Sequence, residues 1–318
     1  MAEKNLDFDT VIDRTHTNSL KYDFAVQRGK PKHGMLLRVA DMDFQVSSYI
    51  QEALSGSVAH GIFGYSEAEG SYFEAVAGWM SRHYGWNVEE NWLVKTPGIV
   101  FALAQAVRAF TEPGDAVLLQ QPVYYPFSQV IRDNGRKIVD NTLVQGEDGR
   151  YRIDFTDFEE KIRSCKVKLF FLCNPHNPVG RVWTKDELER MGDICLRHQV
   201  IIMDDEIHCD LIRCDKKHIP MGKVMPDYKR LITCMAPSKT FNLAGMMISN
   251  VIIRDEGLKE IWLGRHYNFD NPLSIAAAQA AYEKGEPWLE ELRAYLDENF
   301  RFTGEYLKEH LPKAKYRV

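Results

Sequence analysis

Short apolar runs that alternate with helix-like segments dominate the chain from about residue 92 onward. Each run is apolar at consecutive positions rather than at every second one, and in chain order the runs are 92–95, 116–120, 166–173, 200–203, 231–235 and 250–253. Strands with this pattern are buried on both faces, which is typical of parallel sheets covered by helices. We therefore predict an α/β fold whose large domain has three layers, α/β/α, around a mainly parallel sheet.

Helix-like segments separate these runs and support the parallel arrangement. The most strongly marked one begins after Thr184, because Glu187 completes a capping box, and it is predicted to end near His198. The other predicted helices are 51–60, 71–84, 99–110, 125–134 and 274–311, the last with a break at Gly285-Glu286-Pro287.

The length of 318 residues allows one large domain and a smaller one. We predict that residues 1–47 contribute to a smaller α+β domain, that 48–288 form the large domain, and that 289–318 begin the second part of the smaller domain. The final stretch, Leu311–Val318, resembles the first half of a strand. We therefore expect the chain to be truncated within an element.

Composition argues against several classes of protein. A formal net charge of -5 disfavours a nucleic-acid surface, and no apolar run approaches the roughly 20 residues that span a membrane. The first ten residues contain no apolar secretory segment. The six cysteines include no CxxC pair, and several lie in apolar segments where a reduced thiol is usual. We expect a cytoplasmic protein with neither a zinc ribbon nor a disulfide framework.

Polar or glycine-containing turns follow five of the predicted strands, at the ends where parallel sheets bind ligands. After the first, Gly98 opens a helix whose first N–H groups, from Ile99 and Val100, suit a phosphate; the alternative is an ordinary helix start. After the second, Tyr124 and Tyr125 lie on a proline-bounded loop, where they either stack on a flat ring or pack in the fold.

The next three turns carry amides, acids and a lysine. The asparagine amides of 174–180 (NPHNPVG) can bond an aromatic hydroxyl. Three acids in a row, Asp204-Asp205-Glu206, are costly after a buried strand unless one meets a cation such as a pyridinium nitrogen. Lys239 can attack an aldehyde when partly unprotonated, although a solvated loop lysine is the alternative. A phosphorylated pyridine with an aldehyde and a hydroxyl uses all five turns, so we predict pyridoxal 5'-phosphate as the cofactor.

Five motifs resemble those of one enzyme family: RVADMDF (38–44), TPGIVFAL (96–103), NPHNPVGRVW (174–183), DDEIHCDL (204–211) and APSKTFNLAG (236–245). They are similar to the class I/II aminotransferase superfamily, whose members depend on pyridoxal phosphate and have fold type I. Within it, the chain resembles most the cystathionine beta-lyase (MalY/PatB) branch. The resemblance extends from about residue 6 to the end of the chain.

The resemblance implies a role for each candidate residue. Lys239 binds the cofactor aldehyde covalently and, once released, moves the Cα proton of the substrate. Asp205 pairs with the pyridine nitrogen, Asn177 bonds the ring hydroxyl, and Tyr124 stacks on the ring.

The phosphate contacts are implied in the same way. The backbone of Ile99 and Val100, after Gly98, and the Ser238 hydroxyl hold the phosphate. Tyr65 in the GIFGY loop matches a tyrosine that reaches the phosphate of the neighbouring subunit, so a homodimer with shared active sites is implied.

The chain departs from the family pattern at three points. His208 stands where many aminotransferases have a tyrosine, and a histidine there is usual in the lyase branch. Met247 stands where many relatives have an arginine on the phosphate. The arginine that grips the substrate carboxylate is expected beyond residue 318.

By resemblance, the expected activity is a carbon–sulfur β-lyase that acts on cystathionine or cysteine-S-conjugates and releases pyruvate, ammonia and a thiol. A class I/II aminotransferase is the first alternative, because both reactions begin with loss of the Cα proton. An inactive or regulatory relative is the second, motivated by Met247 and the absent carboxylate-binding arginine.

Overall fold

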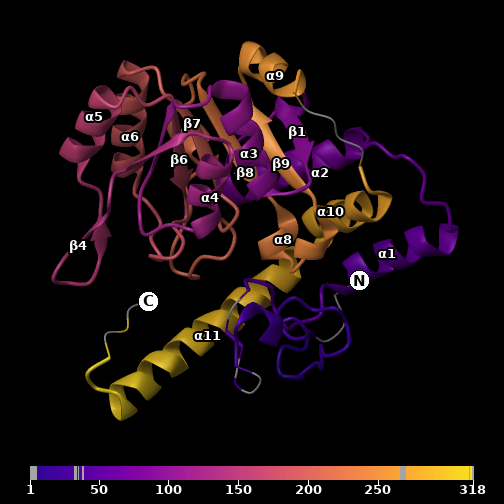
Figure 1. The fold of residues 1–318 in the computed structure, drawn as a ribbon. Coiled ribbons are helices and arrows are strands. Elements are labelled where there is room, and N and C mark those ends of the chain that lie inside the picture. The colour runs from indigo at the N-terminus through magenta and orange to yellow at the C-terminus, as the bar shows by residue number, and fades with distance from the viewer. Residues whose placement is uncertain are drawn as a thin grey trace.

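The computed structural model describes residues 6–31, 34, 36, 37, 39–265, 270–314 and 316. In this part of the chain a seven-stranded sheet forms the centre, with the strand order β1-β9-β8-β7-β6-β2-β3 (Figure 1). Its strands are β1 (Leu93–Thr96), β2 (Ala116–Leu119), β3 (Lys137–Asp140), β6 (Leu169–Cys173), β7 (Ile201–Asp205), β8 (Leu231–Met235) and β9 (Ser249–Ile253). Among these seven strands, β9 alone runs antiparallel to its neighbours β1 and β8, so the prediction of a mainly parallel sheet is confirmed.

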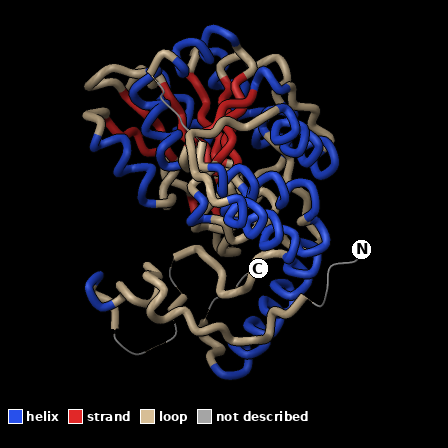
Figure 2. Tube along the Cα trace, turned by 90° about the vertical axis from the view of Figure 1, so that its right-hand side faces the viewer, coloured by secondary structure: helices blue, strands red, loops and turns tan. Residues whose placement is uncertain are grey.

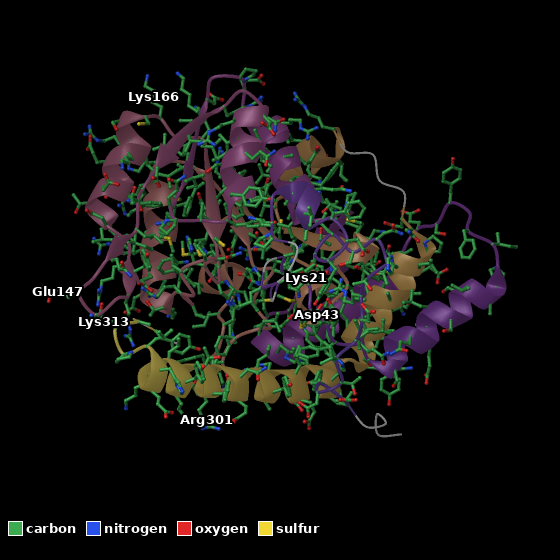
Figure 3. All side chains as sticks on the ribbon, turned by 60° about the horizontal axis from the view of Figure 1, so that its bottom comes forward. Lys21, Asp43, Glu147, Lys166, Arg301 and Lys313 are labelled. Carbon is green, nitrogen blue, oxygen red and sulfur yellow. The ribbon has the colours of Figure 1, made fainter. Side chains whose placement is uncertain are left out.

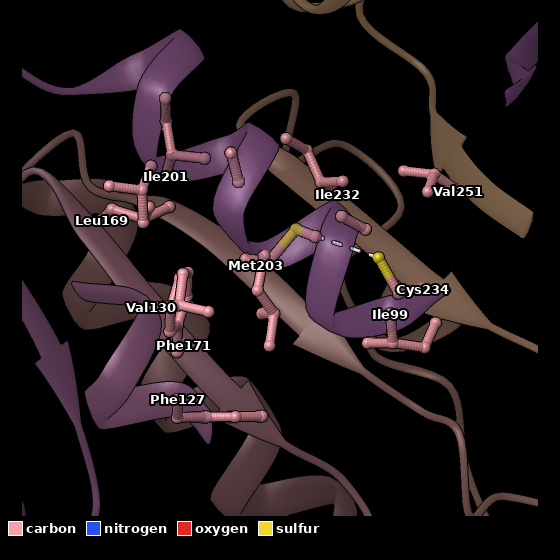
Figure 4. Close-up of a cluster of buried hydrophobic side chains, with 14 of the residues drawn as sticks. Ile99, Phe127, Val130, Leu169, Phe171, Ile201, Met203, Ile232, Cys234 and Val251 are labelled. Atoms are coloured by element: carbon pink, nitrogen blue, oxygen red, sulfur yellow. Dashed lines mark hydrogen bonds between the residues drawn. The ribbon is translucent and has the colours of Figure 1, made fainter. Parts of the chain in front are cut away.

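Helices cover both faces of the sheet because alternate strand residues project to opposite sides. On one face, Phe171 and Met203 pack with α3 (Ile99–Phe110), α4 (Tyr125–Asp133) and α9 (Glu256–Leu263) (Figure 4). On the other face, residues such as Phe170 and Ile202 pack with α5 (Phe155–Ser164) and α6 (Lys185–Arg197). The structure therefore has the predicted α/β/α layers.

A third apolar cluster lies beside the sheet, around Trp79, Phe241 and Trp288. It joins α2 (Gly70–Tyr84), α10 (Pro272–Lys284) and the start of α11 (Glu286–His310), and α1 (Ser48–His60) packs along α10. The remaining elements are short: a two-stranded sheet of β4 (Val144–Gln145) and β5 (Tyr151–Arg152), the helices α7 (Met221–Val224) and α8 (Pro237–Thr240), and three 3-10 turns at 26–28, 90–92 and 244–246.

The amino-terminal segment packs against α11, away from the central sheet (Figures 1 and 2). The Phe8 ring meets the Trp288 ring edge-on at 5.7 Å, and the Tyr295 hydroxyl donates to Asp9 Oδ1 at 2.9 Å. The division into domains stays a prediction; its boundary at 288/289 falls inside α11, which is one continuous helix. None of the described helices is both long and apolar enough to cross a lipid bilayer.

Most predicted elements lie within a few residues of the observed ones, and the break between α10 and α11 is at Gly285 as expected. The strand expected to begin at Leu311 does not begin there, because Leu311–Ala314 form a turn in which the Ala314 N–H donates to the Leu311 carbonyl at 2.8 Å. Of the residues after this turn, 315, 317 and 318 lie outside the described part of the chain.

The predicted capping box at the start of α6 is present. The Glu187 N–H donates to Thr184 Oγ1 at 3.2 Å, and the Thr184 N–H donates to Glu187 Oε2 at 2.8 Å. We expect Thr184→Ala to lower the free energy of unfolding by about 1 kcal/mol, because a first-turn N–H loses its acceptor. Urea denaturation of Thr184→Ala and of Thr184→Ser, which keeps the hydroxyl, tests this. Equal midpoints for the two variants would contradict it.

Candidate active site

The turns singled out in the sequence come together at one edge of the sheet. Because β9 is antiparallel to both β1 and β8, strand β1 runs in the same direction as β8, and with it β7, β6 and β2. The carboxyl ends of these strands therefore share an edge, where parallel sheets bind ligands. The turns at this edge carry Gly98, Ile99, Val100, Tyr124, Asn177, Asp205, His208, Ser238 and Lys239.

Lys239 lies on the one-turn helix α8, directly after β8, with Pro237 at the first helical position. The side chain is half-buried, and its Nζ donates to the Ala40 carbonyl at 2.9 Å. Burial lowers the pKa of Lys239, and the carboxylates of Asp41 and Asp205 offset part of that change. A lowered pKa increases the fraction of neutral amine, which is the nucleophilic form.

Asp205 is the last residue of β7 and is 5% exposed. The Ile207 N–H donates to its Oδ1 at 3.1 Å. Burial raises the pKa of Asp205 to about 7; the Glu206 carboxylate adds to the rise, while the Ile207 N–H and Lys239 oppose it. This carboxyl group is therefore poised to lose its proton when a cation is placed against it.

The other two acids of the run are also fully buried, and the structure explains how the fold tolerates them. Glu206 Oε2 lies 3.0 Å from His218 Nε2, and the Met221 N–H donates to Glu206 Oε1 at 2.8 Å. Burial raises the pKa of Glu206, but His218, Asp204 and the Met221 N–H together lower it below its usual value. Burial and the neighbouring Glu206 raise the pKa of Asp204 well above its usual value, which favours its neutral, protonated form.

The sequence had suggested a pyridinium as the partner of this acidic run. The structure adds a second basic partner from within the chain, His218, which faces Glu206. No local pattern pointed to His218, because it lies in an irregular segment between β7 and α7.

His208 is half-buried two residues before Asp210, on the turn that follows β7. Burial lowers the pKa of His208 to about 4, and the nearby Lys239 ammonium contributes to the same shift. The imidazole is therefore neutral at pH 7.

Tyr124 and Asn177 lie on adjacent turns, since the Tyr124 N–H donates to the Asn177 carbonyl at 3.0 Å. Tyr124 is 38% exposed. Partial burial is the main cause that raises the pKa of its hydroxyl, and Tyr125 and Asp205 raise it further. The Asn177 N–H donates to Cys173 Sγ at 3.3 Å, and His176 Nε2 lies 3.1 Å from the Gln120 carbonyl. These contacts fix the two turns against each other.

The start of α3 lies beside the end of β8. Ile99 is buried in the same cluster as Cys234, and Figure 4 shows the two side chains close together. Gly98 caps the helix, and its carbonyl accepts the Ala102 N–H at 3.0 Å. The first residues of a helix have no intrahelical acceptor for their N–H groups, so this end suits an anion. Met247, which replaces the arginine of many relatives, is 63% exposed.

Tyr65 lies on the connection between α1 and α2, and this connection is at the outer edge of the molecule in Figure 1. It is 91% exposed, and the preceding Ile62 and Phe63 are 69% and 58% exposed. It is thus at the surface of the chain rather than in the cluster around Lys239.

The sequence reading overlooked how the amino-terminal segment closes the site. Asn242, just after α8, donates its amide to the carbonyls of Met42 and Phe44 at 3.0 Å each and accepts the Met42 N–H at 2.9 Å. Arg14 pairs with Asp41 at 2.6 Å, and Lys21 pairs with Asp43 at 2.6 Å (Figure 3). These contacts give the RVADMDF motif a structural role that the resemblance did not imply; its Arg38 lies outside the described residues.

Comparisons with known proteins identify the family of the chain. The model of the family "Aminotransferase class I and II" matches residues 32–316. Cystathionine beta-lyase PatB of Bacillus subtilis is 42% identical over 316 residues, which cover 98% of this chain and 81% of that protein. Protein MalY of Escherichia coli is 31% identical over 318 residues, again with 98% of this chain and 81% of that protein covered.

Solved structures show the same fold. A PLP-bound putative aminotransferase from Clostridium difficile superposes with a TM-score of 0.96 at 39% identity, covering 98% of this chain and 82% of that chain. A PLP-bound C-S lyase from Staphylococcus hominis gives a TM-score of 0.94 at 38% identity, covering 99% of this chain and 80% of that chain. The predicted fold class is confirmed. The chain belongs to the aminotransferase class I and II family.

Proposed function

We propose that the protein is a pyridoxal-phosphate-dependent carbon–sulfur β-lyase. Its substrates would be cystathionine or other cysteine-S-conjugates, which are cleaved with water to pyruvate, ammonia and a thiol. The observation that carries this proposal is the presence, at one sheet edge, of both a half-buried lysine of lowered pKa and a buried aspartate of raised pKa. Perturbed groups of this kind cluster at functional sites. Relatives named cystathionine beta-lyase and C-S lyase support the reaction type.

The residues present fit the cofactor. Asp205 is a buried carboxyl without an ion-pair partner among the described residues, and a pyridinium nitrogen would supply the missing positive charge. Tyr124 would stack on one face of the ring, and Asn177 would form a hydrogen bond with the ring hydroxyl. The first turn of α3 after Gly98 (Ile99 and Val100), with Ser238, would hold the phosphate. Because position 247 is a methionine, the phosphate would depend on these N–H groups and this hydroxyl. When bound, the cofactor withdraws electrons from the substrate Cα.

Lys239 would hold the aldehyde and, after the substrate displaces it, take the proton from the substrate Cα. Its lowered pKa suits both tasks, because each needs the neutral amine. His208 would contact the cofactor beside Asp205. Because its imidazole is neutral at pH 7, it would not compete with the pyridinium for the Asp205 carboxylate.

An aminotransferase is the second candidate, since a putative aminotransferase superposes on this chain with a TM-score of 0.96. The two activities share every residue described above except His208, and they differ in where the proton goes after it leaves Cα. The histidine at position 208, in place of the tyrosine of many aminotransferases, favours the lyase.

Incubation of the purified protein with cystathionine distinguishes these candidates. We expect thiol and pyruvate to form in equal amounts without any added keto acid, because elimination regenerates the cofactor. A product that forms only when 2-oxoglutarate is added would instead establish an aminotransferase. If the protein takes up no pyridoxal phosphate, as judged by its visible absorbance, then it is neither enzyme but an inactive or regulatory relative.

We also infer that two copies form a homodimer with shared active sites. The exposed Ile62, Phe63 and Tyr65 support this, because three large apolar or aromatic side chains on one loop are a suitable contact surface for a partner. The free thiols of all six cysteines are consistent with a reducing compartment, which we take to be the cytoplasm.

A further inference from the structure

A buried carboxylate that the proposed reaction does not use accepts a hydrogen bond from Thr240, the residue next to Lys239. Asp210 is 6% exposed and follows His208 on the turn after β7. This turn is tightly folded: the Cys209 N–H donates to the Glu206 carbonyl at 3.0 Å, and the Leu211 N–H donates to the His208 carbonyl at 3.1 Å. The position of Asp210 is therefore fixed relative to Asp205 and His208.

Three donors from two other elements converge on this carboxylate. Trp79 Nε1, from α2, donates to Oδ1 at 3.1 Å, and the Tyr84 hydroxyl at the end of α2 donates to the same oxygen. Thr240 Oγ1, on α8, donates to Oδ2 at 2.6 Å. In the described part of the chain, no basic side chain forms an ion pair with Asp210, so neutral donors alone stabilise it.

A buried carboxylate is costly unless its oxygens are hydrogen-bonded, and hydrogen bonds to a charged acceptor are stronger than neutral ones. The geometry of such a cluster is therefore well defined. Burial, followed by the Asp210 charge, raises the pKa of Tyr84 well above its usual value, which keeps its hydroxyl protonated as a donor.

Thr240 is the residue next to Lys239, and α8 is only four residues long. The fully buried Thr240 side chain anchors this short helix through its hydrogen bond to Asp210. The next residue, Phe241, packs edge-on against Trp79 with ring centroids 5.4 Å apart. A displacement of Thr240 would therefore move Lys239 as well. Figure 1 shows α8 just below the strands, next to α10 and above the start of α11.

We propose that Asp210 is a positioning residue: by accepting the Thr240 hydroxyl, it holds Lys239 at a fixed place relative to Asp205 and His208. This inference rests on the proposed function, because it concerns the amine that captures the cofactor. It adds a part of the site that touches neither cofactor nor substrate.

The test measures how fast cofactor-free protein captures pyridoxal phosphate. The visible absorbance of the bound cofactor monitors this reaction. Thr240→Val keeps the size of the side chain and removes the hydroxyl, and we expect it to slow capture about 10-fold, since small displacements of a reacting group are costly. Asp210→Asn should slow capture in the same direction. Thr240→Ser restores the donor and should capture at close to the wild-type rate.

Tyr84→Phe is the matched control, because it removes one hydroxyl from the other oxygen of the same carboxylate. We expect it to lower the thermal midpoint without slowing capture more than about twofold, because it leaves α8 anchored. Wild-type rates in both Thr240→Val and Asp210→Asn would overturn this inference, as would equal slowing by Tyr84→Phe. Failure of the wild-type protein to capture the cofactor at all would overturn the proposed function together with this inference.

Discussion

Lys239→Ala is expected to remove covalent capture of pyridoxal phosphate and to lower turnover of cystathionine by at least about 10⁴-fold, the upper range for one general base. The reason is that one amine supplies two functions, the bond to the aldehyde and the acceptance of the Cα proton. Its half-buried position and lowered pKa make it competent for both. Visible absorbance reports the first function and pyruvate release reports the second.

Two controls separate this effect from a general loss of positive charge. Lys239→Arg keeps a cation next to Asp41 and Asp205 but lacks the nucleophile, so it should be as inactive as Lys239→Ala. Lys313→Ala changes an exposed lysine beyond α11 and should behave like wild type (Figure 3). Full activity in Lys239→Ala would exclude this residue from catalysis.

Local patterns predicted most of the fold because the determinants of those elements are local. Helix α3 is bounded by Gly98 and Thr111, and the capping box at Thr184 fixes the start of α6. The direction of β9 was not predictable in the same way. Ser249–Ile253 is buried at every position, just as β7 and β8 are, so the burial pattern is the same whichever way the strand runs.

The candidate site was predictable where its residues follow strands and unpredictable where it depends on distant pairs. The carboxyl ends of neighbouring parallel strands lie at the same edge of a sheet. Asn177, Asp205 and Lys239 could therefore be grouped from sequence order. The contacts of Lys239 with Ala40 and of Tyr84 with Asp210 join residues 199 and 126 positions apart. Such pairs have no local signal, since only the packing of α2 and the amino-terminal segment brings them together.

The pKa of Asp205 leads to the second large effect, which concerns stability. In the folded, cofactor-free protein this pKa is raised from 3.8 to about 7, so between these values the folded state binds a proton that the unfolded state has lost. The contribution of Asp205 to stability must then fall as the pH rises from about 4 to about 7, at up to about 1.4 kcal/mol per pH unit, and stay low above that range. Asp205→Asn removes this titration, and it also removes the Asp205 charge that helps to raise the pKa of Asp204.

We therefore expect cofactor-free Asp205→Asn to resemble wild type near pH 4 and to be more stable than wild type at pH 8, by a few kcal/mol, following the same linkage. Denaturation midpoints at the two pH values measure this. With pyridoxal phosphate bound the order should reverse, because a pyridinium lowers the pKa of Asp205 and stabilises its charged form, which asparagine cannot replace. A variant that is less stable than wild type at pH 8 without cofactor would show that Asp205 serves the fold. The expected reversal would show that this buried carboxylate is a cost to the empty protein that only its ligand offsets.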